Sequence, residues 1–181
     1  FKKTENKLLN LSNLILTFVG MSTPKHKEVL ERIKQMLIKD ELTVVDGLTA
    51  ICELLQKKLK NYDWVGFYFS DFKDQMLYLK AFAGTPTNHT SIPFGKGICG
   101  QVALSKKNFL VPDVTAVDNY IACSLDVRSE LVVPIFFKGK NIGQIDIDSK
   151  TPDRFTKKDE NLLSTICNLI SSSYGNLLNQ L

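Results

Sequence analysis

The chain has 181 residues, of which 44% are hydrophobic and 23% charged, with a formal net charge of +4. These values are typical of a soluble globular domain and exclude a disordered chain, a collagen-like fibre and a polytopic membrane protein. The basic residues are scattered and mostly lysine, so we expect no nucleic-acid partner. Four widely spaced cysteines and two histidines fit neither a disulfide scaffold nor a common metal site. We therefore expect free thiols, a cytoplasmic location and no metal ion or cofactor.

The first forty residues predict a helical extension, followed by one domain over residues 41–181. The apolar run from Leu8 to Val19 has helical spacing and polar interruptions. It is too short to cross a bilayer and is followed by no cleavage motif, so we expect an amphipathic helix and no membrane anchor. That helix would pack on the domain or on a second subunit. A further helix is predicted from Pro24 to about Lys39, with Ser22 and Thr23 as its cap.

Two longer helices are predicted near the ends of the domain. The first has apolar residues three and four positions apart from Val44 to Leu59, and it begins with an N-terminal turn at Thr43 and Asp46. The second runs from about Lys157 to Leu178. Two of the cysteines, Cys52 and Cys167, fall on their apolar faces, and we expect both to be inert core residues.

Between these helices the hydrophobic period changes to two, which predicts two antiparallel hairpins. Their strands would span Trp64 to Phe69 with Met76 to Ala81, and Glu130 to Phe137 with Asn141 to Asp148. A short helix from about Ile98, an extended segment from Asn108 to Val114 and an irregular stretch from Asp118 to Asp126 would connect them. This order predicts an α+β fold, with a mainly antiparallel sheet and helices on one face.

Alternation along the last predicted strand separates its two aspartates from its two isoleucines. If Ile145 and Ile147 face the core, Asp146 and Asp148 project together from the other side. Neighbouring carboxylates raise each other's pKa, which suits a general acid or the binding of a ligand ammonium group. A solvated strand face is the structural alternative. The same alternation puts Trp64 and Tyr68 on one face of the first strand.

Two cysteines lie outside the predicted core helices. Cys99 follows a glycine-rich stretch at the start of the short helix, where backbone amides and the helix dipole favour a thiolate. The stretch lacks the spacing of a phosphate-binding loop. Cys123 lies in the irregular connection, where reactive thiols are more common than in a helix core. No histidine is placed by the sequence as an obvious base for it.

Six motifs in the same order resemble the free methionine-(R)-sulfoxide reductases, which are single GAF domains. The similarity covers about residues 43 to 178. It implies a six-stranded antiparallel sheet with the N- and C-terminal helices on one face, a homodimer, and a small pocket for free methionine sulfoxide. The motifs are WVGFY at 64–68, IPFGKGICG at 92–100, VPDV at 111–114, YIAC at 120–123, RSELVVP at 128–134 and GQIDIDS at 143–149.

The resemblance also implies a role for each matching residue. Cys123 would be the catalytic nucleophile and Cys99 a cysteine that resolves the sulfenic acid, with thioredoxin or another thiol closing the cycle. Trp64 and Tyr68 would hold the methyl-sulfur end of the substrate. Three carboxylates would bind its ammonium group and help to protonate the sulfoxide oxygen, namely Glu130, Asp146 and Asp148.

One loop departs from the family pattern. The reductases typically carry a third cysteine just before the IPFG segment, whereas residues 84–91 read GTPTNHTS. His89 in this loop either faces the pocket and contacts the ligand or lies on the surface. The leading hypothesis is thus a thiol-dependent reductase of free methionine-(R)-sulfoxide. The alternative is a non-catalytic GAF sensory module that binds a small ligand or senses oxidants through Cys123.

Overall fold

The computed structural model describes residues 23–39, 42–116 and 126–178. The helix predicted over Leu8 to Val19, and Cys123, lie outside the described residues. The division of the chain at residue 40 stays a prediction. The described elements are, in chain order, α2 (Pro24–Lys39), α3 (Val44–Lys58), β1 (Trp64–Asp71), β2 (Met76–Ala83), β3 (Ser91–Pro93), α4 (Gly97–Ser105), β4 (Phe109–Val111), the 3-10 helix η1 (Val114–Ala116), β5 (Ser129–Phe137), β6 (Lys140–Ser149) and α5 (Lys157–Leu178).

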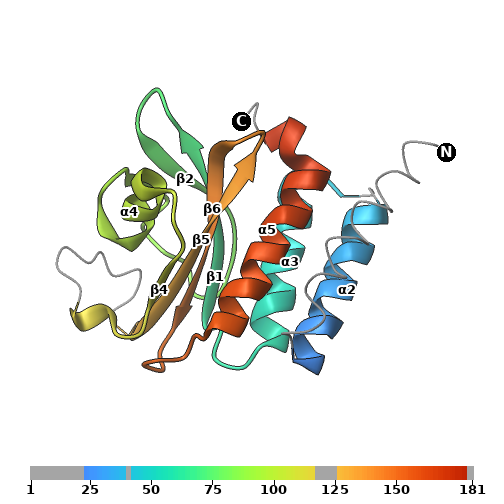
Figure 1. Cartoon of the computed structure of the whole chain (residues 1–181), viewed down its shortest axis with the longest axis horizontal. Coiled ribbons are helices and arrows are strands. Elements are labelled where there is room, and N and C mark those ends of the chain that lie inside the picture. The colour runs from blue at the N-terminus through green and yellow to red at the C-terminus, as the bar shows by residue number, and fades with distance from the viewer. Residues whose placement is uncertain (1–22, 40–41, 117–125, 179–181) are drawn as a thin grey trace.

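The strands form one six-stranded sheet in the order β3-β2-β1-β6-β5-β4. Every neighbouring pair is antiparallel. The two predicted hairpins, β1–β2 and β5–β6, lie side by side through the β1–β6 pairing. Helices α2, α3 and α5 stand on one side of the sheet and α4 on the other (Figure 1). The predicted α+β class and antiparallel six-stranded sheet are confirmed, as is the packing of the described N- and C-terminal helices on one face.

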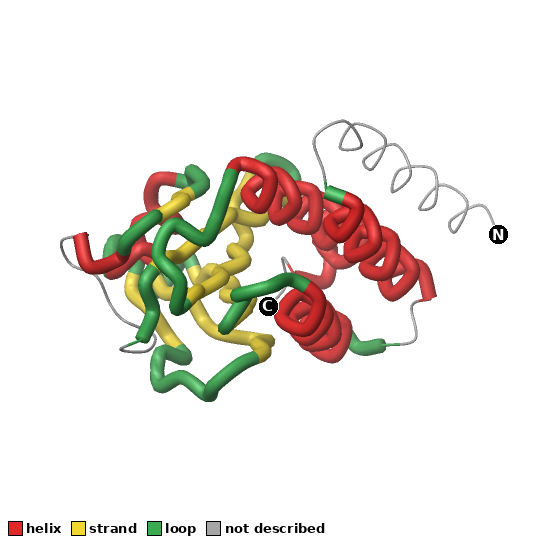
Figure 2. The backbone as a smooth tube through the Cα atoms, turned by 90° about the horizontal axis from the view of Figure 1, so that it is seen from below, coloured by secondary structure: helices red, strands yellow, loops and turns green. Residues whose placement is uncertain are grey.

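The larger core lies between the sheet and the three helices α2, α3 and α5, which Figure 2 shows together on one side of the strands. It contains the inward residues of all three helices and the alternate residues of the central strands, including Ile145 and Ile147. Cys52 and Cys167 are buried in it, and burial raises the pKa of both thiols well above the usual range. Both cysteines are therefore core residues, as their helical spacing predicts.

Side chains cap α2 and α3 at predicted places, and a further side chain caps α5. Thr43 accepts a hydrogen bond from the Asp46 amide at 3.2 Å, and Thr23 accepts one from the His26 amide at 3.1 Å. At the start of α5, Asp159 accepts hydrogen bonds from the Thr156 amide and hydroxyl. These bonds satisfy amides that have no partner within the helix. None of the described helices is both long and apolar enough to cross a membrane.

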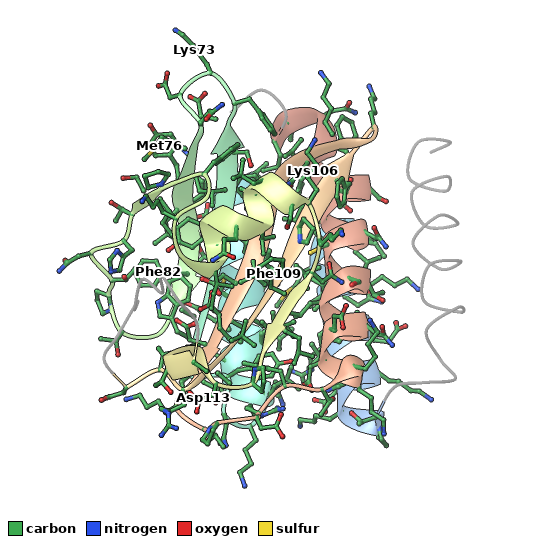
Figure 3. The ribbon with its side chains drawn as sticks, turned by 60° about the vertical axis from the view of Figure 1, so that its left-hand side comes forward. Lys73, Met76, Phe82, Lys106, Phe109 and Asp113 are labelled. Atoms are coloured by element: carbon green, nitrogen blue, oxygen red, sulfur yellow. The ribbon has the colours of Figure 1, made fainter. Side chains whose placement is uncertain are left out.

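A second, smaller core lies on the opposite face of the sheet, beneath α4. Its buried residues come from the strands, from α4 and from the segments around Val114 and Val127. Figure 3 looks toward this face, with Phe82 and Phe109 among the labelled side chains. This cluster contains Trp64, Tyr68 and Cys99. The sheet thus separates the three-helix core from the face that carries the residues singled out by the sequence.

The remaining differences from the predicted elements are at their boundaries. β2 extends to Ala83, two residues beyond its predicted end, and the three-residue strand β3 has no counterpart in the alternation analysis. The segment predicted to be extended up to Val114 ends as a strand at Val111, and Val114 begins η1. Short edge strands are defined by pairing with a neighbour, which hydrophobic period alone does not reveal.

Candidate active site

Strand alternation builds a row of polar side chains on the α4 side of the sheet. The row consists of Gln144, Asp146 and Asp148, all on β6 and all at most 2% exposed. The intervening isoleucines belong to the three-helix core. The predicted shared direction of the two aspartates is confirmed, and the alternative of a solvated strand face is wrong. The row is flanked by β1, where Trp64 is opposite Asp148, and by β5.

Three aromatic side chains form a wall beside this row. The Trp64 ring stacks on Phe82 with centroids 6.0 Å apart and an interplanar angle of 16°, and its centroid lies 6.3 Å from that of Tyr68. Glycines leave space for the indole. A Cβ at Gly66 would collide with the six-membered ring of Trp64, and one at Gly84 would lie 2.8 Å from Trp64 Cδ1. The W-x-G pattern therefore lets the indole lie flat along β1.

A cavity of about 160 Å³ opens at the end of the row. Trp64 and Asp148 line it together, and the other described lining residues are Asp63, Thr85, Pro86, Val127, Ser149 and Lys150. Among the described residues, neither carboxylate oxygen of Asp148 has a hydrogen-bond partner, and neither has Trp64 Nε1. Buried polar atoms without partners are costly, so this cavity is suited to a ligand that supplies hydrogen bonds.

Three buried carboxyl groups meet at this face, and none of them forms an ion pair with a described residue. Burial, followed by the charges of Asp146 and Asp148, raises the pKa of Glu130 well above its usual value. Burial and the charge of Asp146 do the same for Asp148. For Asp146, burial raises the pKa to about 7, although hydrogen bonds with Cys99 and Glu130 oppose the rise. The group can therefore donate protons or bind a cation near neutral pH.

Cys99 lies in the first turn of α4 and points at this group. Its Sγ donates a hydrogen bond to Asp146 Oδ2 at 3.2 Å, and the residue is 5% exposed. The glycine-rich stretch folds tightly before it, with a 2.8 Å hydrogen bond from the Gly95 amide to the Gly100 carbonyl. The sequence favours a thiolate here, and the hydrogen bond requires one proton between the Cys99 sulfur and the Asp146 carboxyl group.

The donor atoms of Cys99, Glu130 and Asp146 all lie within 4.8 Å of one another. A thiol and two carboxylates could hold a divalent cation such as Zn²⁺. In this structure, however, the Cys99 thiol makes its hydrogen bond with the Asp146 carboxylate instead. The proximity alone does not distinguish a metal site from a proton-sharing cluster, and the expectation of no metal ion stays a prediction.

Two further predicted site residues, Tyr68 and His89, are joined by a hydrogen bond. Tyr68 is fully buried, and its hydroxyl donates a 2.9 Å hydrogen bond to the backbone carbonyl of His89. His89 is half-buried in the loop between β2 and β3. Its carbonyl group helps to hold the Tyr68 side chain in the aromatic wall. Whether the imidazole contacts a ligand stays open, as does every predicted role of Cys123.

The structure adds residues that the sequence analysis missed. Phe82 completes the aromatic wall, but the predicted strand ended one residue before it. Gln144 is fully buried and its amide nitrogen and oxygen have no partner among the described residues. A signal for it was present, because Gln144, Asp146 and Asp148 alternate along one strand. Val127 and Lys150 line the cavity from segments outside the predicted motifs.

Comparison with known proteins gives consistent matches. A family model described as GAF domain matches residues 41–173. Protein YtsP of Bacillus subtilis is 36% identical over 79% of this chain and 88% of its own length. The free methionine-R-sulfoxide reductase of Escherichia coli is 34% identical over 72% of this chain and 78% of its own. The substrate complex of the Neisseria meningitidis free methionine-R-sulfoxide reductase aligns with a TM-score of 0.74 and 34% identity, covering 83% of this chain and 91% of that one.

Proposed function

The chain belongs to the GAF domain family, and we propose that it reduces free methionine-R-sulfoxide to methionine. The observation that carries the proposal is the cavity shared by Trp64 and Asp148, with a stacked aromatic wall and unpartnered carboxylate oxygens. Relatives named for this reaction, one of them solved with its substrate, support it.

The two ends of the substrate, its ammonium group and its methyl-sulfur group, both match residues that line the cavity. A free amino acid presents an ammonium group, for which the Asp148 carboxylate offers two unpartnered oxygens. Its methyl-sulfur end is apolar and suits contact with Trp64, which lines the cavity and is backed by Phe82. The buried carboxyl groups of Glu130 and Asp146 can supply the proton for the sulfoxide oxygen. These carboxylates would repel a negatively charged ligand, which argues against a nucleotide phosphate.

The reaction we propose oxidises two thiols to one disulfide for each sulfoxide that is reduced. The thiolate of Cys123 attacks the sulfoxide sulfur while a carboxyl group protonates the oxygen. The attack forms a bond between the Cys123 sulfur and the substrate sulfur. The hydroxyl group then moves from the substrate sulfur to the Cys123 sulfur as this bond and the original sulfur-oxygen bond break, which releases methionine and leaves Cys123 as a sulfenic acid. A second thiol, from Cys99 or from outside the protein, condenses with the sulfenic acid and releases water. Thioredoxin or another dithiol then reduces the resulting disulfide. A homodimer in the cytoplasm is the assembly and location proposed with this activity.

The decisive experiment is a single turnover with pre-reduced protein. We expect about one methionine per active site, with Cys123 then trapped by dimedone as the sulfenic acid. Cys123→Ser should abolish methionine formation, while Cys52→Ala, in the three-helix core, is the matched cysteine control. Asp148→Asn should raise the substrate concentration for half-maximal rate at least roughly tenfold, because it removes the charge that binds the ammonium group.

The alternative sensory role predicts a different result from the same experiment. A sensor would bind methionine sulfoxide or a related amino acid without releasing methionine. Tight binding by calorimetry together with no product in the presence of either dithiothreitol or thioredoxin would therefore rule out the reductase and favour the sensor. The same calorimetry with the (S) epimer and with a methionine-sulfoxide peptide would measure selectivity for the free (R) form.

A further inference from the structure

The hydrogen bond between Cys99 and Asp146 has no place in a purely resolving role for Cys99. A resolving thiol acts only after the sulfoxide has been reduced, by attacking an oxidised sulfur. In the reduced protein, however, Cys99 is buried and already donates to Asp146 Oδ2 at 3.2 Å. This contact joins α4 to the carboxylate row on β6 before any oxidation has occurred.

The contact divides the two oxygens of Asp146 between different environments. Oδ2 is held by Cys99, while Oδ1 has no hydrogen-bond partner among the described residues although it is fully buried. A carboxylate with one oxygen fixed presents the other in a defined direction. The backbone of α4 is fixed in turn by its tight glycine-rich start, where an added Cβ at Gly100 would lie 2.5 Å from the Pro93 carbonyl oxygen.

We propose that Cys99 is a positioning residue for substrate reduction, whose thiol holds Asp146 Oδ2 and so fixes the orientation of this carboxyl group. This proposal rests on the proposed reductase function and deepens it. It gives Cys99 a task in the first half-reaction, in which no disulfide is formed. The thiol contributes a hydrogen bond there, which a hydroxyl group can replace and a methyl group cannot.

The surroundings of Asp146 set the direction of the expected pH effect. It faces Cys99 from α4, Glu130 from β5 and Asp148 on its own strand, and its β1 partner is Gly66, which carries no charge. The Cys99 hydrogen bond lowers the pKa of Asp146, whereas burial raises it. Removing the donor should therefore shift any Asp146-dependent pH midpoint upward.

Single-turnover kinetics of pre-reduced protein, freed of reductant before sulfoxide is added, separate the two roles. We expect Cys99→Ala to raise the half-saturating sulfoxide concentration roughly tenfold and to shift the pH midpoint of the first turnover upward by about one unit. Cys99→Ser should restore both values to near those of the wild type. Wild-type behaviour of both variants in the first turnover would overturn the proposal and leave Cys99 with resolution alone. Equal defects in both variants would also contradict it, because serine retains the donor.

Infrared spectroscopy tests the contact without turnover. The Cys99 S–H stretch, identified as the band lost in Cys99→Ser, should lie at lower frequency than that of Cys167, whose nearest acceptor is the Val133 carbonyl at 3.7 Å. Asp146→Asn should shift the Cys99 band and leave the Cys167 band in place. An unshifted Cys99 band would overturn the proposal even in an active enzyme. An absence of methionine formation by wild-type protein with the shifted band intact would count against the reductase function instead.

Discussion

At the scale of single residues, Gly66 determines whether the aromatic wall can form. Because glycine has no side chain, the Trp64 indole can occupy the space beside the Gly66 backbone. We expect Gly66→Ala to displace the indole, to destabilise the fold by about 1–3 kcal/mol and to weaken substrate binding. Urea denaturation and single-turnover kinetics would measure the two effects. Gly139→Ala in the β5–β6 turn is the matched control, because its Cβ meets nothing within 4 Å and only its positive φ is strained. An unchanged affinity in Gly66→Ala would contradict the role of the indole.

Asp146 makes the stability of the fold depend on pH. Its pKa is about 7 in the folded protein and near 3.8 in the unfolded chain, mainly because of burial. The unfolded chain therefore loses its proton first, and the free energy of unfolding should fall by a few kcal/mol as the pH rises from about 4 to about 7. Asp146→Asn should remove this part of the loss and be more stable than the wild type at pH 8. Parallel stability profiles of the two proteins between pH 4 and 8 would show that Asp146 does not carry the effect.

Which site residues the sequence could predict depends on whether their signal is local. The common direction of Asp146 and Asp148 follows from period-two alternation, and the structure confirms it. The hydrogen bond made by Cys99 does not follow from its place in a helix. It depends on a carboxylate 47 positions away in sequence, which only the sheet brings within 3.2 Å. Burial and distant charges are properties of the assembled fold.

At the scale of elements, the start of α5 joins three parts of the helical layer. The Asp159 carboxylate accepts hydrogen bonds from the Thr156 amide and, at 3.0 Å, from the Tyr62 hydroxyl. It also lies 3.4 Å from the Arg154 guanidinium and 3.8 Å from the imidazole of His26 in α2. Its side chain is only 4% exposed. We expect Asp159→Asn to cost about 3 kcal/mol of unfolding free energy, because the partly buried Arg154 guanidinium and the Tyr62 hydroxyl lose a charged partner.

Thermal and urea denaturation would measure this cost. Glu160→Gln, one residue further along the same turn, should cost less than about 1 kcal/mol, since its main ion pair is with the exposed Lys157. Equal losses for the two variants would show that the position in the helix, rather than the buried network, determines the effect.

Element boundaries illustrate the limit of sequence patterns. The long helices and both hairpins are predicted because many periodic residues support each of them. β3 has three residues and exists through its pairing with β2. The end of β2 was placed too early because Phe82 and Ala83 are both apolar enough to blur the alternation. That difference removed Phe82 from the predicted site although its place opposite Gly66 follows from the strand pairing.

At the scale of the whole molecule, the three described cysteines are shielded from solvent on both faces of the sheet. Cys52 and Cys167 lie in the three-helix core and Cys99 beneath α4, each at most 5% exposed. We expect a short pulse of iodoacetamide at neutral pH to leave these three unmodified in the folded protein and to modify all of them in urea. Peptide mass spectrometry would identify the labelled positions. Labelling of Cys99 in the folded state at the rate seen in urea would contradict its burial.

The fold class was accessible from sequence because the order of helices and hairpins is encoded locally. The pairing of β1 with β6, which places Trp64 opposite Asp148, joins residues from the two ends of the domain. No local pattern specifies that contact. The resemblance to a known family implies one pocket for both residues but names no strand pairing, and this pairing is the contact that builds the cavity.

Residues 144–148 of β6 alternate between two faces of the sheet, and this alternation limits the insertions and deletions that the strand tolerates. Odd-numbered isoleucines serve the three-helix core, and the even-numbered Gln144, Asp146 and Asp148 serve the site. Inserting or deleting one residue within this strand would exchange the two sets downstream of the change, sending carboxylates into the apolar core and isoleucines into the cavity. A change of two residues would preserve both. Single substitutions in this strand keep both sets of residues on their faces, whereas insertions and deletions keep them there only when they change the length by two residues.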